Sequence, residues 1–399
     1  MACMAFFCAA ALSGKAGEIL AVSLVETLSP SNIDMLMPEL FTDVPAPAAR
    51  YTVDSYLIRL ESTYLDGKTT PVTVQVFVPR LSGREKRILY VFAPGSTGLR
   101  DACRPSREHI AGIHWGLYRT HVLSHVGQGV IGVLPDYMGF GDPDPAHRQP
   151  YMSVTAEGRV MLDAIRAVQD FLSRKYSQSV SGTAVFVAGF SQGGHAAFAA
   201  ADLRARYAPR VRIDGIIGYG PSTNLEALFR EYPEVAPMAI FTFSKIYGKE
   251  RFDPDRILAP RWAATLERDV TRQCVGGMQA YYPAAPRDLY RPEFAESLLN
   301  GRLGEKYPEI EKILRENSPG LSGHKVPALI LEGSDDVVVS VKSQQAFVRA
   351  LCRTACPVKY SLYKGRRHDT RQAGFQEARA WMEKRARGES PETSCESFK

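Results

Sequence analysis

The sequence predicts an α/β fold: a mostly parallel, eight-stranded sheet with helices on both faces. Three observations lead to this expectation. Apolar runs that suit buried strands alternate with segments of helical period along most of the chain. A Gly-rich turn at residues 189–194 joins one such strand directly to a helix. Residues 225–325 interrupt the alternation, as a large insertion between two strands would.

The expected strands fall into two groups. Residues 54–63 and 71–78 alternate apolar and polar side chains, as an antiparallel hairpin does. The remaining strands are apolar runs typical of a parallel sheet that is covered on both faces. These runs are residues 88–93, 130–134, 184–190, 213–219, 326–331 and 358–363. Helical patterns between them cover residues 155–175, 192–207, 341–351 and 370–387.

The insertion at residues 225–325 is predicted to be a mainly helical cap over the sheet. Nine prolines separate its short helical stretches, and a structureless loop of this length is uncommon in a compact domain. The core then comprises residues 14–224 and 326–399. Residues 30–50, which are rich in Pro and Ala, are expected to form an extended lead-in.

Composition excludes several classes of protein. Of the 399 residues, 45% are hydrophobic and 23% are charged, which excludes a disordered chain, a collagen-like repeat and a coiled coil. The net charge is +6, but the basic residues are not clustered, so no nucleic-acid partner is expected. This charge is compatible with peripheral contact at a lipid interface.

Residues 1–13 are predicted to be a signal peptide, because a short, apolar run ends in a small-x-small cleavage pattern at Ala11-Leu12-Ser13. No basic residue precedes the run, so a frayed terminus is the alternative. The protein is therefore expected to be secreted or periplasmic, with a cytoplasmic location as the alternative. Five cysteines lie beyond this segment, which suits one or two disulfides and at least one free thiol.

The sharpest motif is G-x-S-x-G around Ser191, which follows the strand 184–190 and precedes the Ala-rich helix 192–207. A serine nucleophile on such a strand-to-helix turn needs small residues two positions to either side, because larger side chains would collide. The motif alone is weak, and a plain Gly-rich turn is the alternative. Its position between strand and helix indicates that Ser191 is a nucleophile.

A serine nucleophile needs a base and an orienting acid, in the order Ser, acid, His. His368 follows the acid candidates and precedes the last helix. Asp336 fits the usual spacing of Gly, two residues, Asp, two residues, Val, from Gly333 to Val339. Asp335 is the alternative acid.

The other histidines fit the role of base less well. His195 lies on the helix after the nucleophile, and His324 precedes the acid. His121 and His125 have metal-ligand spacing, but helix-surface histidines are commoner than metal sites. We therefore expect neither a metal nor another cofactor.

The oxyanion of an acyl-transfer intermediate needs backbone donors. One is the amide of Gln192, directly after the nucleophile. The second is expected from the Gly-rich loop 93–98, with Ser96 as the donor and Thr97 as the alternative.

Longer stretches resemble the α/β-hydrolase superfamily over most of residues 54–387 and are most similar to the secretory lipase family of fungi and bacteria. The matching stretches are residues 94–98, 101–106 (with Cys-x-Pro-Ser), 135–141 (Pro-Asp-Tyr-x-Gly), 162–167 and 191–195. Pro94 and the sequence of the cap depart from the family's pattern. The resemblance implies ester hydrolysis on acyl-lipid-like substrates, and a disulfide from the Cys-x-Pro-Ser segment into the cap. In an exported protein this bond would join Cys103 to Cys274.

We expect a serine carboxylic-ester hydrolase that acts on small-molecule esters or lipids with an apolar acyl part. A serine peptidase or acyltransferase on the same fold, or a catalytically silent binding protein, are the alternatives. The oligomeric state is not defined by the sequence. Cys395 could pair with Cys352 or Cys356. Aromatic residues of the insertion suit either an acyl pocket or the cap's own core: Phe241, Phe243, Trp262, Tyr281 and Tyr282.

Overall fold

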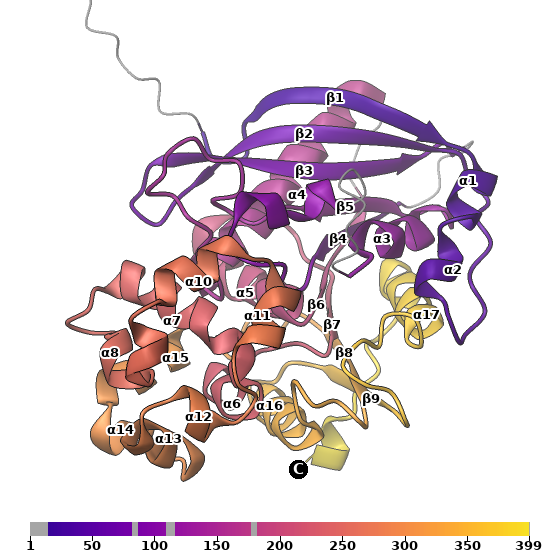
Figure 1. The fold of residues 1–399 in the computed structure, drawn as a ribbon. Helices are drawn as coiled ribbons and strands as arrows, with labels where there is room; N and C mark the ends of the chain where they lie inside the picture. The colour runs from indigo at the N-terminus through magenta and orange to yellow at the C-terminus, as the bar shows by residue number, and fades with distance from the viewer. Residues whose placement is uncertain (1–14, 82–86, 109–115, 177–181, 399) are drawn as a thin grey trace, which may run out of the picture.

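A nine-stranded sheet runs through the protein in the order β1-β2-β3-β5-β4-β6-β7-β8-β9 (Figure 1). The computed structural model describes residues 15–81, 87–108, 116–176 and 182–398. From β5 to β9 all neighbouring strands are parallel, whereas β1, β2, β3 and β5 pair antiparallel. The strands are β1 (Ile19–Leu28), β2 (Val53–Thr63), β3 (Thr69–Pro79), β4 (Ile88–Ala93), β5 (Ile131–Pro135), β6 (Ala184–Phe190), β7 (Gly215–Tyr219), β8 (Ala328–Gly333) and β9 (Val358–Tyr363).

The prediction of a mostly parallel α/β sheet is confirmed, but the prediction of eight strands is wrong. The additional strand, β1, pairs only with β2 at the edge of the sheet. Two register shifts, between Ile19 and Ala21 and between Leu24 and Glu26, interrupt its pairing. Such irregularities break the alternation of period two that identifies a half-buried strand in a sequence.

The segment between β1 and β2 is not an extended lead-in, as the sequence analysis expected. It contains the short helices α1 (Pro30–Asp34) and α2 (Met37–Leu40). Ser29 begins α1 with a capping box, in which its side chain accepts from the Asn32 amide. The apolar side chains of both helices are buried, so tertiary packing stabilises helices too short to form alone.

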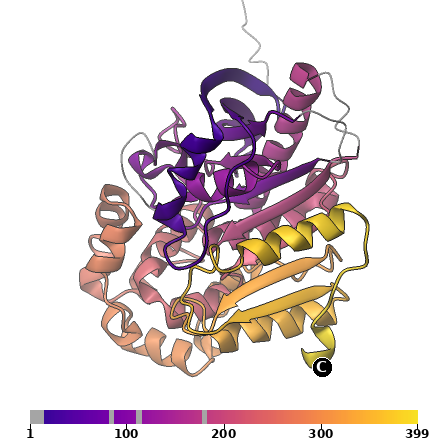
Figure 2. The same cartoon turned by 90° about the vertical axis from the view of Figure 1, so that its right-hand side faces the viewer.

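Helices cover both faces of the parallel part of the sheet (Figure 2). Their apolar sides pack on the alternating side chains of the strands, which gives each face its own core. On one face lie α4 (Val154–Tyr176), α5 (Gln192–Tyr207) and α16 (Val341–Arg353). On the other lie α3 (Tyr118–Val126) and α17 (Phe375–Ala386). None of the described helices is long and apolar enough to cross a membrane.

The chain between β7 and β8 is helical and forms a layer of its own beside the sheet (Figure 1). Its apolar side chains form a separate core, which includes Phe241, Phe243 and Tyr282, with Trp262 packed against it. Its helices are α6 (Leu225–Glu231), η3 (Pro233–Val235), α7 (Ala236–Tyr247), α8 (Pro254–Ile257), α9 (Pro260–Ala263), α10 (Leu266–Arg272), α11 (Val275–Tyr281), α12 (Pro286–Leu289), α13 (Pro292–Leu299), α14 (Leu303–Lys306) and α15 (Pro308–Glu316).

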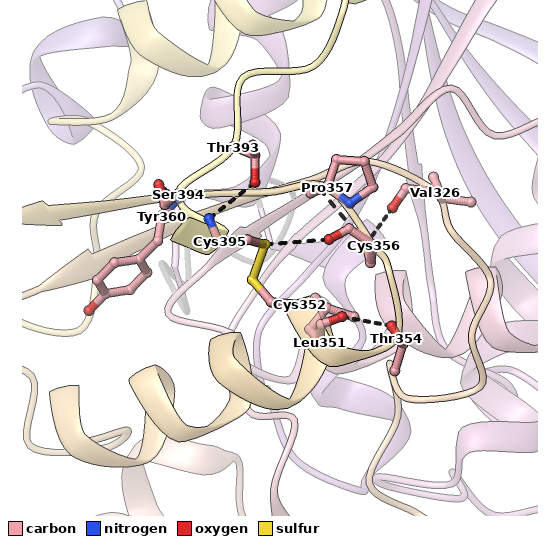
Figure 3. The surroundings of a disulfide bond; sticks show 10 residues. All are labelled: Val326, Leu351, Cys352, Thr354, Cys356, Pro357, Tyr360, Thr393, Ser394 and Cys395. Atoms are coloured by element: carbon pink, nitrogen blue, oxygen red, sulfur yellow. Dashed lines mark hydrogen bonds between the residues drawn. A yellow bond between two sulfur atoms is a disulfide. The ribbon is translucent and has the colours of Figure 1, made fainter. Parts of the chain in front are cut away.

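Two disulfides cross-link the chain. Cys103, in the 3₁₀ helix η1 (Asp101–Cys103), bonds to Cys274, so the cap is tied to the core across 171 positions of sequence. Cys352 of α16 bonds to Cys395 near the C-terminus (Figure 3). The thiol of Cys356 is buried and free, and it donates to the carbonyl of Val326 at 3.0 Å.

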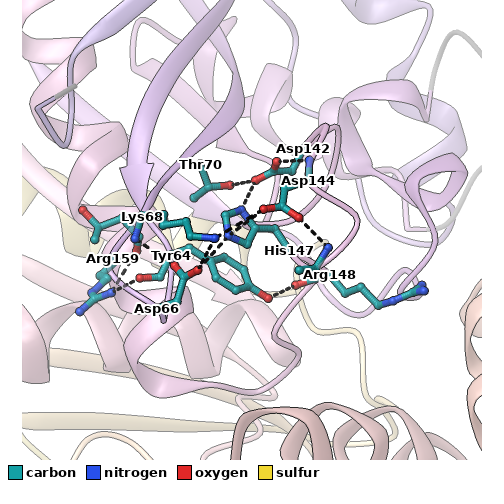
Figure 4. Close-up of polar contacts among 11 residues, drawn as sticks. Tyr64, Asp66, Lys68, Thr70, Asp142, Asp144, His147, Arg148 and Arg159 are labelled. Atoms are coloured by element: carbon teal, nitrogen blue, oxygen red, sulfur yellow. Dashed lines mark hydrogen bonds and ion pairs between the residues drawn. The ribbon is translucent and has the colours of Figure 1, made fainter. Parts of the chain in front are cut away.

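A polar cluster joins the β2–β3 hairpin to the loop after β5 (Figure 4). His147 is buried at its centre, with Nδ1 2.8 Å from Asp142 and Nε2 3.3 Å from Asp66 of the hairpin turn. Its ring stacks on Tyr64, whose hydroxyl donates to the carbonyl of Arg148. The antiparallel part of the sheet is thereby fixed to a loop that leads into α4 and the active-site region.

Replacing both Cys103 and Cys274 by alanine is expected to lower the free energy of unfolding by up to about 5 kcal/mol, because the bond closes a long loop. Urea unfolding of the double variant measures this. The matched control is Cys356→Ala, which removes only a buried thiol donor and should cost about 1 kcal/mol. A double variant as stable as the wild-type protein would contradict the expected cross-link.

Candidate active site

Ser191 occupies a sharp turn between β6 and α5. Its backbone has φ 54° and ψ −114°, a strained conformation for a residue with a side chain. The turn is tight: a Cβ at Gly193 would lie 1.9 Å from the Ala93 carbonyl oxygen, and one at Gly189 would lie 2.1 Å from Gly193. Only glycine fits at these positions, and the turn holds the Ser191 side chain at the carboxyl end of the central strands, where α/β proteins bind ligands.

His368 and Asp336 meet at the carboxyl ends of the neighbouring strands. His368 Nδ1 lies 2.7 Å from Asp336 Oδ2. Asp336 Oδ1 accepts from the amides of Val338 and Val339 at 2.7 and 2.9 Å. Burial alone would raise the pKa of Asp336, but the hydrogen bonds from His368 and the amides bring it below its usual value. An ionised Asp336 therefore orients the His368 ring.

Asp335, the alternative acid, lies elsewhere. Its side chain is exposed and accepts from the hydroxyl of Ser334, and its amide donates to the Arg366 carbonyl. It makes no described contact with His368. The geometry thus favours Asp336.

Ser191 and His368 line one cavity of about 140 Å³ under the cap, but they are not hydrogen-bonded to each other. Ser191 Oγ lies 3.4 Å from the hydroxyl of Ser222. His368 Nε2 is buried and has no partner among the described residues. In unliganded active sites, hydrogen bonds between catalytic groups are often long or poorly aligned.

Of the two residues expected to form the oxyanion hole, Ser96 lines the same cavity and Gln192 directly follows Ser191. Gln192 begins α5, where backbone amides lack helical acceptors. Ser96 lines the cavity, and its hydroxyl is 2.7 Å from that of Tyr151. Thr97 is fully buried away from the cavity, and its carbonyl accepts from the Val275 amide of the cap. This arrangement favours Ser96 over Thr97.

The buried carboxylate of Glu157 supports the turn that carries Ser191. Glu157 of α4 accepts from the Gln192 side chain at 2.7 Å and from the Met152 amide at 2.9 Å, and it contacts His195 Nδ1 at 2.6 Å. His195 Nε2 is 2.8 Å from the carbonyl of Asn317, at the end of the cap. His195 therefore joins α4, α5 and the cap. The sequence analysis did not identify Glu157, whose partners are far away in sequence.

Arg371 anchors the loop that carries His368. Its guanidinium is buried, pairs with Asp369, and donates to the Gly116 carbonyl at 2.6 Å. It also stacks on Tyr118 and on Phe190, whose ring contacts that of His368. The sequence offers no signal for this role, because the partners of Arg371 come from three separate segments.

The two histidines with metal-ligand spacing do not join the site. His121 and His125 lie in the core beside Tyr90, whose hydroxyl is 2.9 Å from His121 Nε2. Burial lowers the pKa of His125 to about 3, so it is neutral at ordinary pH. His109 and His114 lie outside the described residues, as do residues 1–13. In the described segments, no group of three His, Cys, Asp or Glu side chains is arranged to hold a metal ion.

The fold and this site define an α/β-hydrolase. The secretory lipase family matches residues 106–253 of the chain. This match agrees with the resemblance that the motifs of the sequence predicted.

Individual relatives agree with this assignment. The chain is 26% identical to secreted triacylglycerol lipase LIP4 of Malassezia globosa over 319 residues, covering 76% of the chain but only 65% of that protein. It is 23% identical to lipase A of Moesziomyces aphidis, covering 86% and 74%. Both relatives are named lipases.

Solved structures share the fold. The rice cell wall degrading esterase LipA of Xanthomonas oryzae superposes with a TM-score of 0.71 at 18% identity, covering 94% of this chain and 97% of that one. Candida antarctica lipase A in its closed state gives a TM-score of 0.68 at 18% identity, covering 96% and 84%.

Ser191→Ala and His368→Ala are each expected to abolish nearly all turnover while the protein stays folded, and the double variant should be no worse than either, because the residues act as a unit. Steady-state kinetics with circular dichroism checks this. Asp336→Asn should lower kcat by several orders of magnitude by fixing the wrong His368 tautomer. Asp335→Asn is the matched control and should be close to wild type; if it is the more damaging change, Asp335 is the acid.

Arg371→Met is expected to lower the free energy of unfolding by about 3 kcal/mol, because it leaves Asp369 without its cation. This value is at the low end for buried pairs, since the Asp369 side chain is 35% exposed. Urea unfolding measures the loss. The control in the same loop is Arg366→Met, whose surface pair with Asp43 should contribute less than about 1 kcal/mol. Equal losses in the two variants would argue against the anchoring role.

Proposed function

We propose that the protein is a serine carboxylic-ester hydrolase in which Ser191 is the nucleophile, His368 the general base and Asp336 the orienting acid. This proposal rests on one observation. Ser191 and His368 line the same cavity, and Asp336 Oδ2 lies 2.7 Å from His368 Nδ1. Acyl transfer needs this combination of nucleophile, base and acid. A catalytically silent binding protein would not need all three of these residues.

The proposed reaction has two halves. His368 Nε2 takes the proton of Ser191 as Oγ attacks the ester carbonyl, and the oxyanion binds to the amides of Gln192 and Ser96. The tetrahedral intermediate then releases the alcohol, which takes the proton from His368. In the second half a water molecule gives a proton to His368 and attacks the acyl-enzyme. The second tetrahedral intermediate expels Ser191 Oγ, which takes this proton back from His368, and the acid is released. No step requires a cofactor.

The cavity favours esters with a short, apolar acyl chain as substrates. It is walled by Met152 and by the cap residues Leu228, Val235 and Val275. Its volume of about 140 Å³ is below the range of about 300–1,000 Å³ that is usual for ligand pockets. Longer acyl chains, as in lipids, would require the cap to move. A peptidase or an acyltransferase would use the same catalytic chemistry, but no feature of the cavity favours either activity.

We also propose that the protein is exported. Two disulfides suit an oxidising compartment. The Malassezia relative is named a secreted lipase.

With soluble p-nitrophenyl esters, kcat/KM is expected to be highest for short acyl chains, and to fall for chains that exceed the cavity. Leu228→Ala should enlarge the cavity and shift the preference to longer chains. For each methylene group added to the acyl chain, kcat/KM should change by about tenfold in favour of the variant. The reaction of Ser191 with a small phosphonate should not change.

The matched control is Leu299→Ala, a partly exposed cap residue that does not line the cavity. It should leave the chain-length profile as in wild type. Absence of esterase activity in the wild-type protein would refute the proposed function. An unchanged profile in Leu228→Ala would refute the role of the cap in selectivity.

A further inference from the structure

Glu332 is a fully buried carboxyl that directly precedes the turn carrying Asp336. It is the penultimate residue of β8 and lies opposite Leu362 of β9. No N–H or O–H group among the described residues donates a hydrogen bond to either of its carboxyl oxygens. An ionised carboxylate buried without donors is strongly unfavourable. This position therefore suits a neutral carboxylic acid rather than a charged group.

The group that Glu332 faces is Asp336. The Asp336 amide donates to the Gly333 carbonyl at 3.3 Å, and this turn brings Asp336 back toward Glu332. A hydrogen bond between the two carboxyls can form only when one of them carries a proton. On β9, Tyr360 is a titratable group that interacts electrostatically with Glu332, whose charge raises the pKa of Tyr360. Helix α16, which packs on β8, offers no charged side chain among the described partners of Glu332.

The donors around the two carboxyls decide which one holds the proton. Asp336 accepts from His368 and from the Val338 and Val339 amides, whereas Glu332 has no such set. Burial, and then the hydrogen bond and charge of Asp336, raise the pKa of Glu332 to about 10 against a smaller opposing effect of the Gly333 amide. Two adjacent carboxyls in a dry site cannot both ionise easily, so the proton stays on Glu332.

We propose that Glu332 is a positioning residue for the active site: its protonated carboxyl donates a hydrogen bond to Asp336, the carboxylate that orients His368. This inference rests on the proposed function. His368, the Val338 and Val339 amides and Glu332 then all donate hydrogen bonds to Asp336. Together these donors keep the Asp336 carboxylate oriented toward the His368 ring. Glu332 itself touches neither the substrate nor Ser191.

The role has a definite pH dependence. Below about pH 10 Glu332 keeps its proton and donates to Asp336. When the pH rises through this value, Glu332 ionises, the hydrogen bond is lost and two carboxylates repel each other. Turnover by the wild-type protein should therefore fall along an alkaline limb near pH 10 that belongs to Glu332.

Two variants separate the hydrogen bond from simple packing. E332L has a similar volume but no donor. It is expected to lower kcat about tenfold or more with little change in KM, because a catalytic group loses one of its hydrogen-bond partners. E332Q keeps an N–H donor and should restore most of the kcat lost in E332L, but without the alkaline limb near pH 10. Wild-type kcat in a folded E332L variant, or an E332Q profile that keeps the limb, would overturn the proposal.

An infrared difference spectrum tests the proton without relying on activity. At pH 8, the wild-type minus E332Q spectrum should contain the carbonyl stretch of a protonated carboxylic acid. Absence of this band would overturn the proposal, and the test works even if E332L fails to fold. If the wild-type protein hydrolyses no ester, the proposed function fails, whereas the band still decides whether Glu332 holds a proton.

Discussion

The close approach of β4, β6 and α5 around Ser191 is the constraint on which the rest of the protein depends. A strained residue at a strand-to-helix turn persists only where its surroundings determine its conformation. Here the surroundings are the Ala93 carbonyl, which leaves no room for a Cβ at Gly193, and Pro221, which leaves none at Gly194. The two central strands must therefore be in register before the turn can form. All other parts of the site are then positioned relative to this fixed point.

Buried carboxyls connect that fixed point to its surroundings. Glu157 holds the first turn of α5 through Gln192 and reaches the cap through His195. Asp336 connects the last third of the chain to the site through His368. A buried carboxylate is favourable only when its donors are complete. The site is thus held by polar groups that tolerate little displacement, within a core that is otherwise apolar.

The sequence predicted those features whose cause is local. The strand β6 and the helix α5 have the predicted bounds, because the apolar run, the glycines and the Ala-rich helix are contiguous. Ser191, Asp336 and His368 could be selected because each follows a strand in the order that the chemistry requires. Geometry then favours Asp336 over Asp335, a choice that the adjacent residues left open.

Features that depend on distant partners were missed. Nothing near Glu332 or Arg371 in the sequence indicates that they are buried, since burial is produced by β9, by α3 and by loops far along the chain. The edge strand β1 was missed because its pairing is irregular. The aromatic residues of the insertion were compatible with a pocket or a core, and only the packing shows that Phe241, Phe243 and Tyr282 belong to the core of the cap.

The position of the cap in the chain has an evolutionary consequence. It enters between β7 and β8, and its two ends lie side by side, because the Leu225 amide donates to the Ser318 hydroxyl at 3.1 Å. Such an insertion can be lengthened, shortened or exchanged without disturbing the strand order that carries the chemistry. The secretory lipase match ends at residue 253, inside the cap, while the fold extends over nearly the whole chain. Lineages with one hydrolytic machinery can therefore diversify in what they degrade by rebuilding a single segment.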